Sequence, residues 1–236
     1  MIYKILPAVL FLFVSFAPSV TSSPESKNNK AVVSASPISS DSDDNVETVY
    51  NNLQSKTFSM PKLESFTKAL KGFYLLKEQG LVKKDILTII DFSLSSNTKR
   101  LWVIDLKTNT ILYNSLVAHG RNTGNEFANS FLNAAESFKS SLGFYATAEI
   151  YSGKHGKSLR LDGLEKGVNS NARSRAVVIH GANYVSDAFI KNNHRLGRSL
   201  GCPAIPEELT NEIINTIKDK SCLFIYHPSR SSELVS

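Results

Sequence analysis

The chain has 236 residues, with 27 lysines and arginines against 21 acidic residues and a formal net charge of +6. This length allows one domain with a real core plus some flexible sequence. The basic residues are scattered without a dense run, so the charge excess does not indicate a nucleic-acid-binding protein. We therefore predict no nucleic-acid partner.

The first 22 residues have the composition of a targeting segment. Lys4 precedes an apolar run at 5–14, and small residues follow between 17 and 23. This order is typical of a secretory signal peptide, and the run is shorter than the roughly 20 residues that a spanning helix needs. We predict a cleaved signal peptide over 1–22, no permanent membrane span and, since no cysteine lies near the cleavage region, no lipoprotein anchor. Loss of Lys4 lowers the net charge from +6 to +5, which in an exported protein suits an anionic polymer or lipid head groups.

Composition divides the rest of the chain into three parts. Residues 23–45 are rich in Ser, Asn, Asp and Pro, which predicts a disordered linker. Residues 46–84 are predicted to form a helical N-terminal segment, with a weak helix over 45–53 and a stronger one over 60–79. The stronger helix has one apolar face, formed by Leu63, Phe66, Leu70, Phe73 and Leu76. Residues 85–230 are predicted to form the main domain.

β-branched and aromatic residues mark the strands of the main domain. They gather in strand-like runs at 86–92, 100–106, 111–117, 143–151, 159–161, 176–180 and 222–226. One helix is predicted near the end, opened by Pro206 and lined on one side by Leu209, Ile213, Ile214 and Ile217. The predicted fold class is mainly β, with N-terminal helices and one C-terminal helix.

The two cysteines, Cys202 and Cys222, leave two interpretations open. In an oxidising compartment, a pair of cysteines commonly forms a structural disulfide. The neighbouring residues argue against that pairing. Cys222 begins an apolar run that is typical of a buried strand, whereas Cys202 stands between Gly201 and Pro203, where a turn presents a side chain outward.

Several common catalytic motifs are absent from the sequence. It has no Gly-rich phosphate loop after a strand, no G-x-S-x-G elbow and no H-E-x-x-H zinc motif. The five histidines do not pair at the spacing of metal ligands. We therefore predict no metal site.

One histidine and one cysteine remain as candidates for nucleophilic chemistry. His180 ends a strand-like run, a position from which a rigid sheet can hold an active-site residue. Cys202 follows 22 residues later, and its thiol needs a base such as His180 or a positive charge such as Arg198. Gly201 allows close backbone approach, and N–H groups over 200–202 are candidate oxyanion donors. Spacing and composition alone favour the alternative, a structural histidine and a buried cysteine.

These residues resemble the catalytic signature of the L,D-transpeptidases, the YkuD-like family of cell-wall enzymes. That signature has a His-Gly at a strand end and then Ser-His-Gly-Cys, matched here by His180-Gly181 and Ser199-Leu200-Gly201-Cys202. The chain looks most like the branch described as murein L,D-transpeptidase catalytic domain proteins. Typical stretches of that branch are matched at 117–122, 140–145, 151–156 and 197–204, within a similarity that runs from about 91 to 228.

The sequence departs from the better-known branch in two places. Leu200 stands where that branch has a second histidine, so only its backbone is expected to contribute. Pro203-Ala204 replaces an Ile/Val-Arg pair, so a substrate-binding arginine is missing there, and Arg198 is a candidate substitute. Donor and acceptor preferences therefore do not transfer from that branch.

The resemblance implies a YkuD-like β-sandwich of mixed sheets with the Cys–His site in a cleft. It implies that Cys202 attacks the carbonyl between the L- and D-centred residues of a stem peptide, with His180 as base and no cofactor. The group that orients His180 is expected to be a backbone carbonyl or a side chain near Gly181 or Ala182. Tyr184 either lines the donor pocket or packs within its loop.

The resemblance also implies the partners and leaves alternatives open. The expected substrates are peptidoglycan stem peptides, and the protein is expected to be a periplasmic monomer. Carbapenems resemble an acyl donor for this family. His119 and Arg121 either border the cleft or belong to a structural turn. The alternatives are an L,D-carboxypeptidase or hydrolase on the same scaffold, and a non-catalytic peptidoglycan-binding protein with Cys202 and Cys222 disulfide-bonded.

Overall fold

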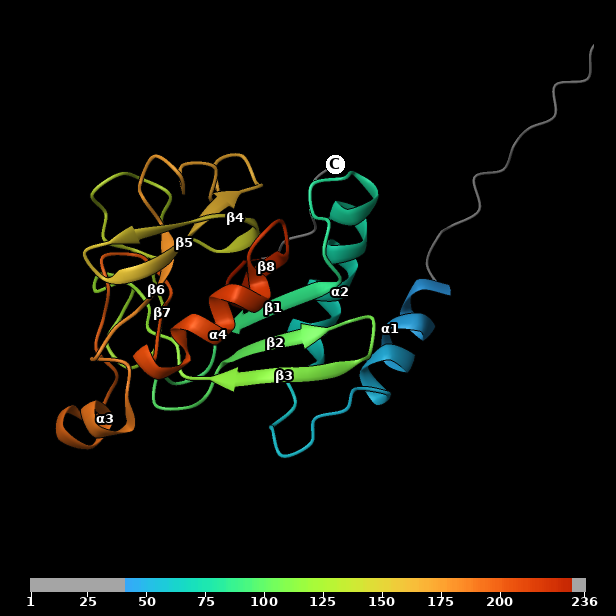
Figure 1. Cartoon of the computed structure of the whole chain (residues 1–236), viewed down its shortest axis with the longest axis horizontal. Helices are drawn as coiled ribbons and strands as arrows, with labels where there is room; N and C mark the ends of the chain where they lie inside the picture. Colours follow the sequence, from blue (N-terminus) through green and yellow to red (C-terminus); the bar gives the residue numbers. More distant parts are fainter. Residues whose placement is uncertain (1–40, 231–236) are drawn as a thin grey trace, which may run out of the picture. The chain divides into compact units, whose positions relative to one another are not determined.

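The computed structural model describes residues 41–230 (Figure 1). The predicted signal peptide over 1–22 lies outside the described residues, as does most of the predicted linker over 23–45. Helix α1, Asp41–Asn51, begins inside the stretch predicted as linker. Residues 41–45 contain no apolar residue, so no hydrophobic periodicity marks the first turn of this helix.

The N-terminal helices pack on one face of the sheet (Figure 1). Helix α2, Leu63–Glu78, turns Phe66, Leu70 and Phe73 inward, where they are almost fully buried. Helix α1 joins the same cluster through Val46, and the ring of Tyr50 lies 5.2 Å from that of Phe66. The amphipathic pattern of the sequence therefore places α2 as the cover of this face.

Eight strands form one continuous hydrogen-bonded sheet. They are β1 (Ile86–Asp91), β2 (Leu101–Asp105), β3 (Thr110–Ser115), β4 (Gly143–Gly153), β5 (Gly156–Gly163), β6 (Val178–Gly181), β7 (Ala204–Ile205) and β8 (Cys222–Tyr226). Their order across the sheet is β3-β2-β1-β8-β4-β5-β6-β7. The pairs β1–β8 and β6–β7 are parallel and the others antiparallel, so the predicted mainly β fold with mixed strand directions is confirmed.

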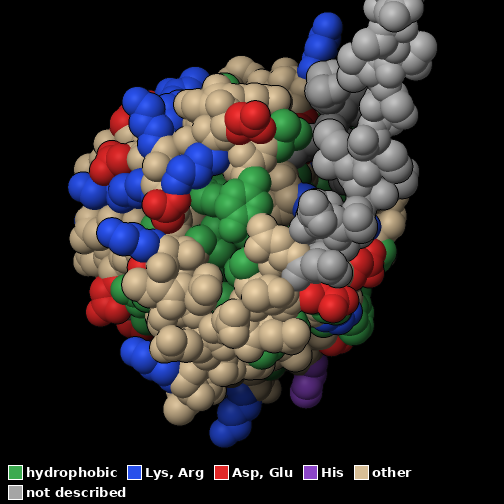
Figure 2. All heavy atoms as spheres, turned by 90° about the vertical axis from the view of Figure 1, so that its right-hand side faces the viewer, with side chains coloured by type: hydrophobic (Ala, Val, Ile, Leu, Met, Phe, Trp, Pro, Cys, Tyr) green, Lys and Arg blue, Asp and Glu red, His purple; other side chains and the backbone are tan. Residues whose placement is uncertain are grey.

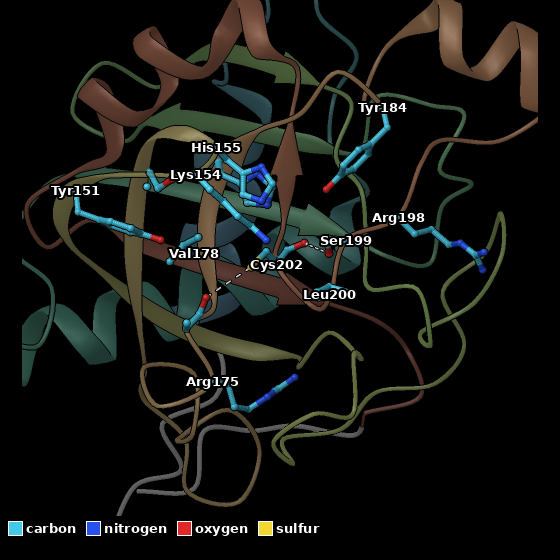
Figure 3. Close-up of a pocket in the computed structure, with 14 residues that line it drawn as sticks. Tyr151, Lys154, His155, Arg175, Val178, Tyr184, Arg198, Ser199, Leu200 and Cys202 are labelled. Atoms are coloured by element: carbon cyan, nitrogen blue, oxygen red, sulfur yellow. Dashed lines mark hydrogen bonds between the residues drawn. The ribbon is translucent and has the colours of Figure 1, made fainter.

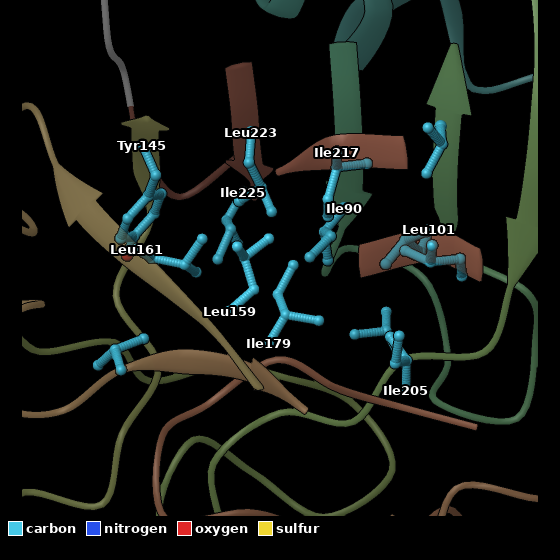
Figure 4. Close-up of a cluster of buried hydrophobic side chains, with 14 of the residues drawn as sticks. Ile90, Leu101, Tyr145, Leu159, Leu161, Ile179, Ile205, Ile217, Leu223 and Ile225 are labelled. Carbon is cyan, nitrogen blue, oxygen red and sulfur yellow. The ribbon is translucent and has the colours of Figure 1, made fainter. Parts of the chain in front are cut away.

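The second hydrophobic cluster lies where the two halves of this sheet face each other. Ile90 and Ile225 come from one half, and Leu161 and Ile179 from the other, yet all four belong to the same cluster (Figure 4). Helix α4, Glu207–Ile217, adds its buried isoleucines to this cluster, as its periodicity predicts. The curled sheet therefore encloses its core in the manner of a sandwich.

Two elements were not predicted from the sequence. Helix α3, Asp187–Asn193, buries no residue, so it has no apolar face to reveal it. It begins where the Ser186 side chain accepts the N–H of Phe189 at 3.3 Å, and it ends at His194 with φ 58°. Strand β7 has two residues and exists only through its pairing with β6.

One face of the molecule carries charges of both signs. Figure 2 shows lysines and arginines interspersed with acidic side chains around a hollow that exposes apolar groups. Exposed ion pairs link some of these charges, such as Arg173 with Glu149 at 2.8 Å and with Asp162 at 2.6 Å. Within residues 41–230, no helix has the length and apolarity needed to cross a bilayer.

Candidate active site

One cavity of about 450 Å³ brings together the histidine and the cysteine that the sequence singled out. His180 reaches it from the end of β6. Cys202 reaches it from the loop between α3 and β7 (Figure 3). The tip of the β4–β5 hairpin, around Lys154, forms another wall. The two predicted groups therefore share a pocket, although 22 residues of sequence separate them.

His180 is held in one orientation by the backbone next to it. The residue is 3% exposed, and its Nδ1 lies 2.8 Å from the carbonyl oxygen of Gly181. Because a carbonyl only accepts, we assign the proton to Nδ1, which leaves Nε2 with a free lone pair. The backbone carbonyl of Gly181 is thus the orienting group, among those that the sequence left open. Burial lowers the pKa of His180 below its ordinary value, so the ring is neutral at pH 7.

Glycine at 181 is required by the packing behind the histidine. A Cβ on Gly181 would collide with Oγ1 of Thr210 in helix α4. In the same stretch, His180 pairs with Ala204 of β7 and with Ser158 of β5. The sheet and helix α4 therefore fix the backbone that carries the imidazole.

Cys202 is half-buried and carries a free thiol in the pocket. Its Sγ lies 3.7 Å from the carbonyl oxygen of Ala176 (Figure 3). Burial raises the pKa of Cys202, while a backbone hydrogen bond from Val178 and the charges of Arg175 and Lys154 oppose that rise. The resting pair is therefore a neutral thiol with a neutral imidazole, an arrangement that needs general-base catalysis to generate the nucleophile.

The loop before the cysteine is a tight turn organised by Ser199. Its Oγ accepts the N–H of Gly201 at 3.0 Å and donates to the carbonyl oxygen of Cys202 at 2.6 Å. Gly201 has φ 122°, and a Cβ there would come within 2.9 Å of the carbonyl oxygen of Lys139. Serine and glycine at these positions therefore shape the turn that presents Cys202.

Of the three backbone N–H groups over 200–202 that are candidate oxyanion donors, two remain without a partner in this turn. The N–H of Gly201 is taken by Ser199, whereas across residues 41–230 the N–H groups of Leu200 and Cys202 have no acceptor. The Leu200 side chain is 55% exposed at the rim of the pocket. Only its backbone is thus available for polar chemistry.

Comparison with known families identifies the domain. A family model described as "L,D-transpeptidase catalytic domain" matches residues 58–226, a stretch that contains both His180 and Cys202. The chain belongs to this family. No curated protein sequence matches the chain.

Solved L,D-transpeptidase structures resemble this domain at low identity. One from Mycobacterium smegmatis is 10% identical with a TM-score of 0.38, and covers 61% of this chain and 59% of its own. L,D-transpeptidase 1 of Mycobacterium tuberculosis is 8% identical with a TM-score of 0.34, and covers 61% and 62%. One from Xylanimonas cellulosilytica is 10% identical with a TM-score of 0.35, and covers 77% and 91%. This chain thus spans about three fifths of the length of the two mycobacterial structures.

Arg198 lines the cavity of this L,D-transpeptidase domain, but its guanidinium is engaged elsewhere. Its guanidinium donates to the carbonyl oxygens of Arg121 and Gly124 at 3.2 and 3.1 Å and to Oδ1 of Asn125 at 2.8 Å. Figure 3 shows the side chain directed away from Cys202. Arg198 therefore secures the loop over 121–125, and the positive potential at the thiol comes from other residues.

Arg175 is one cation near the thiol that sequence reasoning missed. Its guanidinium donates to Oγ of Ser141 and to the carbonyl oxygen of Lys139, both at 2.6 Å. It stands five residues before His180, with no motif to mark it. Arg175 ties the segment over 132–141 to the back of the cysteine turn and lowers the pKa of Cys202 by its charge.

An aromatic residue and a second histidine complete the walls. Tyr184 points its hydroxyl into the pocket, and burial raises the pKa of Tyr184 to about 12, so it is a hydrogen-bond donor at pH 7 (Figure 3). Gly197 packs directly against the Tyr184 ring. The ring of His155 stacks on His180 with centroids 4.4 Å apart and planes at 22°. No sequence motif connects these two histidines.

The block over 117–122 supports the cysteine turn from behind. His119 is 1% exposed, with Nδ1 2.8 Å from Nη2 of the buried Arg100, and it does not line the pocket. Burial and the Arg100 charge lower the pKa of His119 to about 4, so it stays neutral. The carbonyl oxygen of His119 accepts the N–H of Ser199 at 3.0 Å, and a Cβ on Gly120 would lie 3.0 Å from Cα of Gly201. Across the described part of the chain, no group of His, Cys, Asp and Glu side chains could hold a metal ion.

The rate at which iodoacetamide alkylates Cys202 is expected to be low at pH 7. It should still be rising beyond about pH 8.5, the pH at which an ordinary cysteine thiol is half ionised. A raised pKa leaves little thiolate at neutral pH, and its fraction grows until the pH passes that pKa. Rate constants measured between pH 5 and 10 by mass spectrometry test this. A plateau already reached below pH 7 would mean a preformed thiolate–imidazolium pair instead.

Proposed function

We propose that this protein is an exported L,D-transpeptidase that forms or exchanges peptidoglycan stem-peptide links through a thioester on Cys202. The proposal rests on one observation above the others. In a chain of this family, Cys202 and a neutral His180, oriented by the Gly181 carbonyl, line the same cavity. Nucleophile, base and orienting group are the set that covalent acyl transfer requires.

Acylation begins when Nε2 of His180 takes the thiol proton and Sγ of Cys202 attacks the carbonyl carbon of the donor stem. The N–H groups of Leu200 and Cys202, which have no acceptor within residues 41–230, then stabilise the negative charge that develops on the carbonyl oxygen. The C–N bond then breaks, and His180 returns the proton to the leaving amine. A D-amino acid departs and the donor remains as a thioester.

Transfer reverses the roles of the same groups. An amine of a second stem attacks the thioester carbon and gives a proton to His180, and the C–S bond breaks as the new amide forms. The imidazolium then protonates the departing Cys202 sulfur, which restores the neutral pair. Water in place of the amine gives a trimmed stem, the product of an L,D-carboxypeptidase.

The non-catalytic alternative requires a bond that is absent here. Cys202 and Cys222 are both free. Cys222 lies fully buried in β8, where burial strongly raises its pKa. A protein that only binds peptidoglycan through a disulfide-linked fold therefore has less support than an enzyme.

Export belongs to the same proposal. The predicted signal peptide over 1–22 would deliver the domain to the periplasm, where the stem peptides are. The net positive charge suits an anionic wall polymer, and a monomer suffices, because this one chain supplies both His180 and Cys202.

Product analysis tests the reaction class. The mature protein is incubated with a disaccharide tetrapeptide, with and without a second stem that offers a free amine, and the products are separated by mass. We expect cross-linked dimer with the acceptor, a trimmed tripeptide without it, and neither product from Cys202→Ala. Tripeptide alone in both reactions would assign the carboxypeptidase, and no product from the wild type would refute both enzymes.

A further inference from the structure

Among the lysines and arginines that line the cavity, Lys154 is the one whose side chain makes no hydrogen bond or ion pair within residues 41–230. Arg175 is engaged with Ser141 and Lys139, and Arg198 with the loop over 121–125. Lys154 is exposed in the turn between β4 and β5. Figure 3 shows its ammonium extending into the cavity toward Cys202. The side chain is therefore available to an anionic ligand.

Lys154 faces a cavity without acidic side chains, because no aspartate or glutamate lines it. The ammonium acts on both reacting groups, because its charge lowers the pKa of Cys202 and that of His180. A cation within electrostatic reach of nucleophile and base, in a cavity that no acidic side chain lines, favours an anion bound next to the scissile bond.

We propose that Lys154 binds the terminal carboxylate of the donor stem, on the D-amino acid that leaves. This assignment rests on the proposed transpeptidase function. When Sγ of Cys202 meets the scissile carbonyl and His180 faces the scissile nitrogen, the terminal carboxylate lies one Cα away from that nitrogen. The terminal carboxylate is then the substrate anion nearest to Cys202 and His180. Because the charge of Lys154 acts on both of these residues, the carboxylate is the anion that Lys154 contacts.

The β4–β5 hairpin places Lys154 next to the site where that carboxylate would bind. The register of β5 with β6, in which Ser158 pairs with His180, brings the hairpin tip beside the catalytic histidine. His155, the next residue, stacks on the His180 ring. Lys154 is thus a specificity-determining residue that recognises a donor ending in a free acid.

The experiment compares two donor tetrapeptides, one with a free C-terminal carboxylate and one with a C-terminal amide. We expect Lys154→Gln to raise KM for the free acid about 5- to 30-fold, the range for a partly solvated charge-assisted contact. KM for the amide should stay unchanged, and Lys154→Arg should restore binding of the acid. Lys157→Gln is the matched control, because Lys157 lies on the same hairpin and donates to Oδ1 of Asn215 at 2.7 Å.

Binding to Cys202→Ala and to Cys202→Ala/Lys154→Gln separates this inference from the proposed function. Calorimetric Kd values for the two peptides need no turnover. Weaker binding of the acid alone on loss of Lys154 supports the inference even if no product is ever formed. Equal weakening of acid and amide, or none, overturns it while transpeptidation can still stand. A loss that disappears only when a side-chain carboxylate of the donor is amidated overturns the assignment to the terminal carboxylate.

Discussion

We expect the wild-type protein to gain the full mass of one carbapenem molecule after incubation, and Cys202→Ala to gain none. Attack of Sγ on the β-lactam carbonyl opens the ring without releasing a fragment, so the adduct carries the whole inhibitor. The thiol lies in an accessible cavity that also contains His180 as base. Intact-protein mass spectrometry measures the result directly, and the change is from complete labelling to none.

Cys222→Ala is the matched control for that experiment. Cys222 is fully buried in β8 and burial strongly raises its pKa, so its thiol is neither reachable nor ionised. The variant should therefore label like the wild type. An adduct that persists in Cys202→Ala, or one that disappears in Cys222→Ala, would contradict Cys202 as the nucleophile.

The elements that the sequence predicted share one property, which is a local pattern of burial. Helix α2 buries Phe66 and Phe73 on one face. Strand β8 is a continuous apolar run and β1 a largely apolar one, with buried side chains on both faces. Helix α3 buries nothing, and β7 is two residues defined by its partner. Helix α3 is defined by its capping residues and β7 by its pairing with β6. Neither feature produces a hydrophobic periodicity that could be recognised in the sequence.

The candidate site divides in the same way. His180 and Cys202 each stand in a recognisable local sequence, so the motif found them. Lys154 lies in the matched stretch over 151–156, but that match does not reveal that strand register brings it to the cavity. Arg175 reaches the cavity through contacts with the segment over 132–141, and no motif marks it. Arg198 is close to Cys202 in the sequence, but the bridge between Gly120 and Ser199 brings carbonyl groups of a distant loop within reach of its guanidinium.

The largest kinetic effect besides loss of the nucleophile is expected for His180→Gln. Glutamine keeps a polar side chain of similar reach but cannot take the thiol proton, so carbapenem acylation should slow by about 10²- to 10⁴-fold. In the wild type, the midpoint of the acid limb of the pH–rate profile should lie below about 6.5, the ordinary pKa of histidine. The reason is that burial lowers the pKa of His180 and keeps this base neutral at lower pH. Stopped-flow measurement between pH 4.5 and 8 gives both quantities.

His194→Asn separates this effect from a general loss of histidine or of stability. His194 ends α3 with φ 58°, a conformation that asparagine tolerates, and it lies outside the cavity. Its acylation rate and acid limb should match the wild type. If His180→Gln kept the acid limb, some other group would be the titrating base. If its rate fell only in proportion to a lower melting temperature, His180 would be structural, and the neutral thiol of Cys202 would have no base to activate it.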